Sequence, residues 1–253
     1  MAHEISRFNH FDTIPSRLQL VDPAQSTPEG PLRFIETRGP NNPDLGVFLC
    51  NLQAFPEIAR MRDACDERLA TDISLQQMFY EAIPSPELHS TILRIGTLRS
   101  IEPQAIMDFC QKLGQQLKGF ARPDLVMGND IIIGDGIIFT IEPKEPRVNN
   151  PLAVVRQLSL VALQDVGMTN TNQTYSSEFT AHSTDRYARA LTDDRSELQE
   201  LLTVPPIEPA NFQPDAVYVA VNWPARNETT GYGSYPYRVI ARISFNTGEV
   251  MFE

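Results

Sequence analysis

The order of secondary-structure signals repeats once along this chain of 253 residues, and the repeat limits the fold more than any other feature. The first series indicates strand, helix, strand, helix and strands, and the second indicates helix, strand, helix and strands. The two series are offset by roughly 90 residues. The strand between the helices of each series contains the triplet His-Ser-Thr, at 89–91 and 182–184. We therefore expect an α+β protein built from two similar halves.

Two kinds of pattern predict the individual elements. Apolar residues at helical spacing, with Pro103 in a first turn and Gly119 and Gly167 as caps, predict helices. These helices cover residues 54–70, 73–83, 101–119, 150–167 and 192–203. Short apolar or alternating runs predict strands. The strands fall within residues 31–38, 45–52, 87–95, 124–143, 179–187, 215–223 and 235–245, with turns at 128–130 and 134–136.

Composition sets the domain boundary. Residues 1–43 are rich in Pro, Asn, Gly and charge, so we expect an N-terminal extension on the surface. Residues 44–253 then form one domain. The segments 204–214 and 224–236 carry Pro and Gly signals of loops, and we expect the second to be a mobile loop.

Charge and hydropathy restrict the partners. The formal net charge of −11 argues against a protein that binds long nucleic acid, because that affinity comes from many Lys and Arg contacts to phosphates. A small anionic ligand stays compatible with this charge. No run of about eighteen apolar residues is present, and the first residues lack the apolar core of a signal peptide. We expect a cytoplasmic monomer that does not bind membranes.

The three cysteines, Cys50, Cys65 and Cys110, are odd in number and scattered in spacing. This pattern suits neither a disulfide framework nor a zinc cluster. We expect small buried hydrophobic side chains instead.

The triplet places one imidazole beside one hydroxyl. Side chains at i and i+2 of a strand share a face and lie about 6.5–7 Å apart. His89 and Thr91 therefore project together, as do His182 and Thr184, while the serines between them point the other way. If the two halves pack about a pseudo-twofold axis, the two imidazoles face each other across a cleft.

Such a pair suits in-line displacement at phosphorus. A neutral imidazole can take a proton from water or a hydroxyl, and an imidazolium can give one to a leaving oxygen. Threonine hydroxyls can hold the non-bridging oxygens of the phosphate. This chemistry needs no metal or other cofactor, and the residues leave open which histidine acts as acid and which as base.

On these two triplets the chain resembles the two-histidine (2H) phosphoesterase superfamily. That family carries a pair of H-x-[ST] motifs, with x usually apolar, each on a strand of one of two lobes. The resemblance covers roughly residues 45–223. It implies a bilobal pseudo-twofold fold, in which two antiparallel sheets line a central cleft with helices outside. Two departures are the serine in the middle of each triplet and Asp185, where the family usually has leucine.

Four further residues are candidates for substrate binding. Arg186 follows Thr184 by two positions, where its guanidinium would clamp a phosphate oxygen or pair with a nearby acid. Tyr187, Trp223 and Tyr232 are candidates for stacking on a base, or for ordinary packing. Neither a nucleophile elbow nor a recognised metal-ligand spacing competes with the histidine pair.

The sequence therefore predicts a metal-independent phosphodiesterase that acts on a small nucleotide phosphodiester. Candidate substrates are a 2',3'-cyclic phosphate, a short RNA end and a cyclic oligonucleotide. The catalytic residues are His89, Thr91, His182 and Thr184. Two alternatives remain, namely a nucleotide-binding regulatory protein without turnover and an RNA 2',5'-ligase-type activity.

Overall fold

The structure, a computed structural model, describes residues 43–133, 136–146, 149–169, 179–187, 202, 206–223, 225–226 and 233–253. Several sequence predictions lie outside these residues and stay predictions. They are residues 1–42 of the N-terminal extension with its strand at 31–38, residues 134 and 135 of the turn at 134–136, and all but one residue of the helix at 192–203. Most of the loop at 224–236, with Tyr232, also lies outside.

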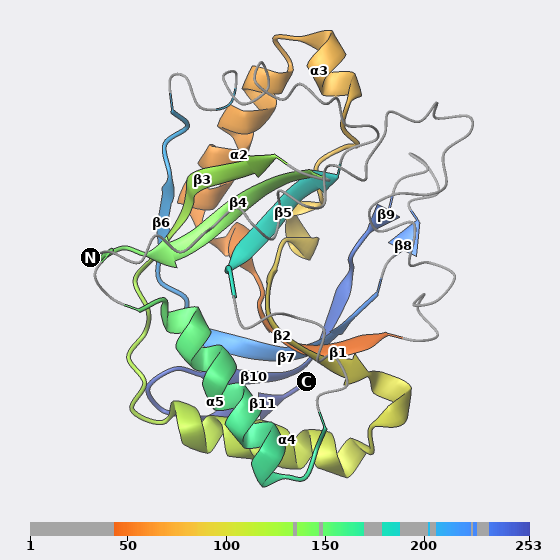
Figure 1. The fold of residues 1–253 in the computed structure, drawn as a ribbon, viewed down its shortest axis with the longest axis vertical. Helices are drawn as coiled ribbons and strands as arrows, with labels where there is room; N and C mark the ends of the chain where they lie inside the picture. Colours follow the sequence, from red (N-terminus) through yellow and green to blue (C-terminus); the bar gives the residue numbers. More distant parts are fainter. Residues whose placement is uncertain are drawn as a thin grey trace.

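A five-stranded antiparallel sheet forms one lobe (Figure 1). Its strand order is β11-β10-β7-β1-β2. The strands are β1 (Asp44–Leu49), β2 (Ser90–Thr97), β7 (Ala216–Asn222), β10 (Tyr237–Ser244) and β11 (Val250–Phe252). The first apolar run of the domain, β1, is therefore an inner strand between β7 and β2, which explains why all six of its residues are buried.

A four-stranded antiparallel sheet forms the other lobe, with the order β5-β4-β3-β6. Its strands are β3 (Leu125–Ile133), β4 (Gly136–Pro143), β5 (His182–Tyr187) and β6 (Ala210–Phe212). A small antiparallel pair, β8 (Ala225–Arg226) with β9 (Gly233–Ser234), lies within the segment that was expected to be a loop.

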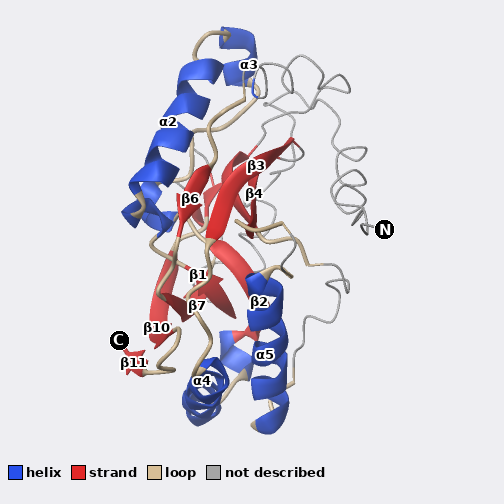
Figure 2. Cartoon of the chain, turned by 90° about the vertical axis from the view of Figure 1, so that its left-hand side faces the viewer, coloured by secondary structure: helices blue, strands red, loops and turns tan. Residues whose placement is uncertain are grey.

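The helices lie on the outside of the two sheets, and Figures 1 and 2 show them at opposite ends of the molecule. Helices α4 (Pro103–Leu117) and α5 (Pro151–Asp165) pack on each other and on the five-stranded sheet. Helix α2 (Pro56–Leu69) packs against β6 of the other sheet, and α3 (Ile73–Gln77) follows it. Single 3-10 turns are η3 (Leu52–Ala54), η4 (Ser85–Glu87) and η5 (Leu98–Ser100).

The lobes do not correspond to the two halves of the sequence. The five-stranded sheet takes β1 and β2 from the start of the domain and β7, β10 and β11 from its end. The four-stranded sheet takes all its strands from the middle of the chain. The expected α+β architecture with two antiparallel sheets is confirmed, but each lobe is assembled from segments that the repeat in the sequence does not group together.

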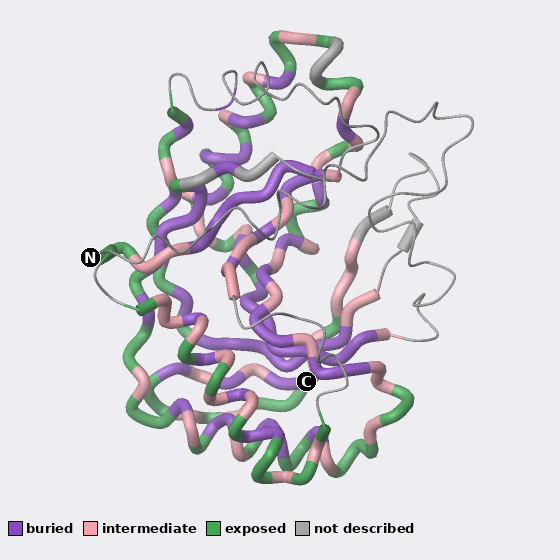
Figure 3. Tube along the Cα trace, in the orientation of Figure 1, coloured by how far each residue is buried: buried purple, intermediate pink, exposed green. Residues whose placement is uncertain are grey.

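One hydrophobic core runs through both lobes, as the buried strands of Figure 3 show. A second, smaller cluster lies on the other face of the five-stranded sheet. It contains Phe48, Cys50, Ala216, Tyr218 and Ala220. Consecutive residues of β1 thus face different clusters, because successive side chains of a strand point to opposite faces.

Local predictions succeeded where periodicity was clear. Helix α4 begins at Pro103 and buries the predicted stripe, and Gly119 and Gly167 both have positive φ. The turn expected at 128–130 is wrong, because β3 continues through it with a register shift between Met127 and Ile131. Gly128, with φ 87°, accommodates this bulge.

Three other details differ from the sequence prediction. The helix expected over 73–83 ends at Gln77. The next residues run beside β5, where the amides of Tyr80 and Ile83 donate to the carbonyls of Tyr187 and Asp185. Strands β6 and β11, of three residues each, were not predicted.

The three cysteines are buried and unpaired, as predicted. Among the described residues, no helix is both long and apolar enough to cross a bilayer.

Candidate functional site

The two histidines are held in the same way by their own backbone. His89 lies between η4 and β2, and its Nδ1 is 2.7 Å from the carbonyl oxygen of Glu87. His182 begins β5, and its Nδ1 is 2.8 Å from the carbonyl oxygen of Thr180. Because a carbonyl oxygen can only accept, Nδ1 donates in both cases. In the neutral form of each ring, Nε2 is then the nitrogen that carries the lone pair.

The rest of each triplet alternates as the sequence predicts. Ser90 and Ser183 are fully buried, whereas Thr91 and Thr184 are half-buried like the histidines. In the five-stranded sheet, Thr91 is opposite Phe48. In the other sheet, Thr184 is opposite Ile138. Each triplet therefore offers an imidazole and a hydroxyl on one side of its strand.

The structure brings the two triplets together, although they belong to different sheets. The hydroxyl of Ser183 donates a hydrogen bond of 2.9 Å to the carbonyl oxygen of His89. Strands β2 and β5 contact each other there, in the centre of the molecule (Figure 1). The two predicted histidines, 93 residues apart, thus meet at the junction of the lobes (182 − 89).

The pKa of His89 lies below the ordinary value of 6.5. Burial is the main cause, because it disfavours the charged ring. The charge of His182 lowers the pKa of His89 further, while the bond to the Glu87 carbonyl acts in the opposite direction. The two imidazoles are therefore close enough to influence each other's protonation, and His89 favours the neutral form.

Two aromatic rings flank His89 that were not singled out from the sequence. The ring of Phe48 lies edge-on at 5.5 Å between centroids, and that of Tyr237 at 5.6 Å. Phe48 comes from β1 and Tyr237 from β10. The only signal in the sequence is their place in apolar strands, which many packing residues share. Both rings pack edge-on against the imidazole, which is a favourable arrangement of aromatic rings.

The two residues that follow the second triplet, Asp185 and Arg186, belong to a buried ionic network. The carboxylate of Asp185, which has no exposed surface, accepts from Arg62 Nε at 2.6 Å and from Arg186 Nε at 2.7 Å. Arg62 also donates to the carbonyl of Ile83 at 2.6 Å. Arg186 pairs in addition with Asp66. The network connects α2, β5 and the segment that leads to His89.

Arg186 does not occupy the face that the sequence predicted for it. A bulge falls between Thr184 and Arg186, so that Arg186 is opposite Ile137 and Thr184 is opposite Ile138. The side chain is buried together with Asp185 instead of lying beside Thr184. Burial alone would lower the pKa of the guanidinium, but the two carboxylates outweigh it and raise that pKa above its ordinary value. Its contact with a substrate stays a prediction.

The aromatic candidates are placed as follows. Tyr187 is half-buried at the end of β5, with its ring 6.1 Å from that of Tyr235. Trp223 is half-buried, packs against the main core and follows β7. No observation tests their stacking on a base.

Among the described residues, no group of three or more His, Cys, Asp and Glu side chains is arranged to hold a metal ion. The two triplets, which are joined by the Ser183–His89 hydrogen bond, contain two imidazoles and two threonine hydroxyls. These groups can transfer protons and donate hydrogen bonds to an oxyanion.

Comparison with known proteins gives similarity in structure only. No protein-family model and no curated protein sequence matches the chain. Among solved structures, E. coli LigT complexed with 3'-AMP aligns with a TM-score of 0.50 and 11% identity, over 81% of this chain and 98% of that one. The protein TT0787 of Thermus thermophilus aligns with a TM-score of 0.48 and 11% identity, over 80% and 98%.

The MHV ns2 PDE domain aligns with a TM-score of 0.46 and 10% identity, over 78% of this chain and all of that one (100%). The alignment with LigT extends over both lobes of the chain and nearly the full length of LigT. The chain therefore has the fold that its paired triplets led us to expect.

Proposed function

We propose that this protein, whose fold is that of the 2H phosphoesterases, is a phosphodiesterase that uses His89 and His182 as general base and general acid. The observation that carries the proposal is the junction of the two triplets. Two histidines with the same Nδ1–carbonyl bond come from separate sheets and are joined through the Ser183–His89 hydrogen bond. A structural histidine would not need a second histidine with the same Nδ1 bond at the same place.

The surroundings of His89 favour one assignment of roles. A general base must be neutral before the reaction, and the lowered pKa of His89 favours that form. His89 Nε2 then takes a proton from the attacking water as its oxygen bonds to phosphorus. His182 gives its proton to the oxygen that leaves as the P–O bond breaks. Water and a cyclic phosphate thus give a phosphomonoester, and proton exchange with solvent restores both rings.

The threonines have a separate task. Phosphoryl transfer places negative charge on the non-bridging oxygens, and positioned donors stabilise that charge. Thr91 and Thr184 lie two residues beyond their histidines, on strands. Their hydroxyls therefore donate to the non-bridging oxygens while the imidazoles act on the attacking and leaving oxygens.

The substrate class is a small nucleotide phosphodiester, with 2',3'-cyclic phosphates as the first candidates. The net charge of −11 disfavours a long polyanion, since such complexes depend on many cationic contacts. A single phosphate held by two histidines and two hydroxyls does not need a basic surface. The structurally similar LigT was solved with 3'-AMP, which is a ligand of this size.

The test is a panel of 2',3'-cyclic nucleotides and short 2',5'- and 3',5'-linked oligonucleotides, with products separated by chromatography in excess EDTA. We expect the cyclic phosphates to open to monophosphates at an undiminished rate in EDTA. Loss of activity in EDTA would contradict metal independence. Tight binding with no product would favour a regulatory protein, and joining of RNA ends would favour a ligase.

The pH dependence tests the assignment of the base. Since the pKa of His89 is below 6.5, the base stays neutral at a lower pH than an ordinary histidine. We expect the acidic limb of the kcat/KM profile to lie below 6.5. An acidic limb above that value would contradict the role of His89 as base.

A further inference from the structure

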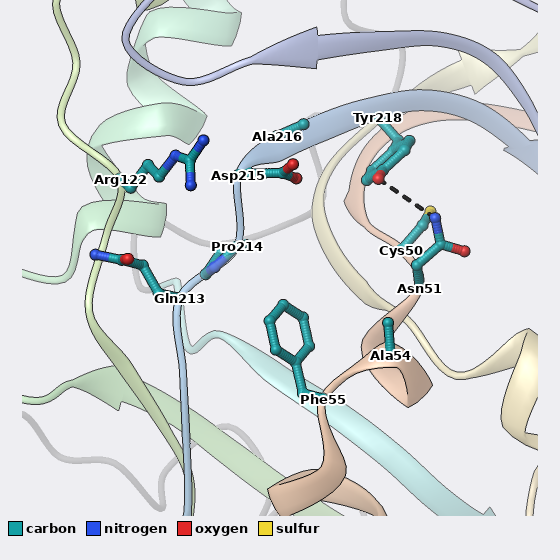
Figure 4. Close-up of a pocket in the computed structure, with 10 residues that line it drawn as sticks. All are labelled: Cys50, Asn51, Ala54, Phe55, Arg122, Gln213, Pro214, Asp215, Ala216 and Tyr218. Atoms are coloured by element: carbon teal, nitrogen blue, oxygen red, sulfur yellow. Dashed lines mark hydrogen bonds between the residues drawn. The ribbon is translucent and has the colours of Figure 1, made fainter.

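A pocket of about 370 Å³ opens beyond the end of β1 (Figure 4). Its walls come from the segment after β1, the loop before β3, and the connection from β6 into β7. The lining residues are Cys50, Asn51, Ala54, Phe55, Arg122, Gln213, Pro214, Asp215, Ala216 and Tyr218. Pockets that hold small ligands begin at about this size.

One wall is built on a left-handed turn. Asn51 has φ 57°, a conformation that asparagine tolerates better than most residues. Its side-chain amide donates to the hydroxyl of Tyr218 and its backbone N–H to the hydroxyl of Tyr237, both at 3.3 Å. The turn therefore connects the end of β1 to two tyrosines of neighbouring strands.

The other walls are also held by specific contacts. The ring of Phe55 packs on Phe212 at 5.3 Å between centroids. Gln213 donates to Asp124 at 3.2 Å. Asp215 accepts from Arg242 at 2.6 Å. A pocket whose walls are cross-linked in this way is formed before a ligand arrives, so binding costs little reorganisation.

The pocket adjoins the histidine pair on the His89 side. Leu49 is opposite Ser90 in the ladder of β1 and β2, so the next residue, Cys50, comes beside His89. The side chains of Tyr237 and Cys50 form a hydrogen bond, and the ring of Tyr237 contacts the ring of His89. Burial raises the pKa of the Cys50 thiol, which therefore stays neutral and serves as an apolar wall.

The lining combines flat apolar surface with polar groups of several kinds. Figure 4 shows the ring of Phe55 and the carboxylate of Asp215 bordering the same space. The Asp215 carboxylate, which also accepts from Arg242, supplies an acceptor, and Arg122 supplies a cation. A planar heterocycle with an amino group on its edge matches an aromatic ring beside a carboxylate, whereas a sugar or a fatty chain matches only part of this set.

We propose that this pocket binds the nucleobase of the substrate, on the His89 side of the phosphorus. The inference rests on the proposed function. It adds a site for the base to the site that binds the phosphate. The base stacks on Phe55, and the amino group on its edge meets Asp215. The site then favours nucleotides over phosphodiesters without a base.

The test fills the pocket and compares two substrates. Ala54 is exposed and lines the pocket, so Ala54→Trp places an indole there without disturbing the core. The substrates are 2',3'-cyclic AMP and the 2',3'-cyclic phosphate of methyl riboside, which lacks a base. We expect the ratio of their kcat/KM values to fall roughly tenfold or more, the size of a lost stacking contact.

A matched control is Ala59→Trp, an equal change at an exposed position of α2 outside the pocket. Its ratio should equal that of the wild type. A second variant, Phe55→Leu, keeps an apolar side chain and removes the aromatic face. We expect it to raise KM for 2',3'-cyclic AMP about threefold to tenfold, because the stacking contact is lost. Equal losses on both substrates, or none, in Ala54→Trp would overturn the proposal.

Binding separates this proposal from the proposed function. Calorimetric titration of the wild type and both tryptophan variants with adenosine 2'-monophosphate requires no turnover. Weaker binding in Ala54→Trp but not in Ala59→Trp supports the pocket even if the protein hydrolyses nothing. No binding to the wild type, or equal dissociation constants in all three proteins, overturns it even if the protein is an active phosphodiesterase.

Discussion

The two His-Ser-Thr segments are alike in what they present and different in what supports them. In each, Nδ1 of the histidine donates to the carbonyl two residues earlier, the serine is buried and the threonine is half-buried. The residue that follows the first triplet, Ile92, lies in the apolar core. The residue that follows the second triplet, Asp185, lies in a buried network with two arginines.

The serines differ as well. Ser183 donates to the His89 carbonyl, whereas the buried hydroxyl of Ser90 has no hydrogen-bond partner in the part of the chain that the structure describes. The positions that the two segments share are the ones to which the proposed function assigns contact with the phosphate. The residues that support these positions differ between the lobes. The support is apolar packing in the five-stranded lobe and a charged network in the four-stranded lobe. Four predictions test this division.

The largest effect is expected where the segments are alike. Replacing His89 or His182 by alanine removes one of the two proton-transfer groups, so we expect kcat to fall by about 10²–10⁴-fold in either variant. Steady-state kinetics on 2',3'-cyclic AMP measures this loss. Thermal unfolding of both variants serves as the control, and near-normal turnover in either variant would refute the paired mechanism.

The second prediction concerns the residues behind the triplets. Asp185→Leu leaves the guanidinium groups of Arg62 and Arg186 buried without their shared carboxylate, so we expect a loss of about 3–5 kcal/mol in the free energy of unfolding. The change at the corresponding position of the five-stranded lobe, Ile92→Val, should lower the free energy of unfolding by about 0.5–1.5 kcal/mol. Urea unfolding measures both, and equal losses would remove the contrast between the lobes.

The third prediction compares the serines directly. Ser183→Ala removes the bond that joins the lobes, so we expect a loss of about 1 kcal/mol in transition-state stabilisation, or about fivefold in kcat, with KM nearly unchanged. Ser90→Ala removes a hydroxyl without a partner and should leave kcat unchanged. If both variants behave alike, the bond does not position His89.

The smallest effect concerns the electrostatic contact between the rings. His182→Gln removes the charge that opposes protonation of His89, so the pKa of His89 should rise. A titration of His89 followed by NMR, in wild type and variant, gives the shift. A fall in that pKa would contradict the closeness of the two rings.

The sequence predicted what depends on local order. Helix α4 was identified because Pro103 and the stripe of Ile106, Phe109 and Leu113 are local signals. The two triplets were found because the histidine and threonine positions repeat together. Strand β6 was missed because three residues in a Pro-rich segment carry no period, and only pairing with β3 makes them a strand.

The surroundings of the site depend on contacts between distant segments. Phe48 and Tyr237 flank His89 only because β1, β2 and β10 belong to one sheet. The place of Arg186 was predicted wrongly because a bulge ends the alternation on which the prediction relied. The same bulge leaves Asp185 and Arg186 buried together, which strict alternation does not allow.

The most direct test is a crystal structure of the protein with adenosine and vanadate, which mimics a pentacoordinate phosphorus. We predict one vanadate with His89 Nε2 and His182 Nε2 hydrogen-bonded to oxygens on opposite sides of it, and a threonine hydroxyl on each side. A vanadate that contacts only one of the two rings, or that binds elsewhere, would contradict the account.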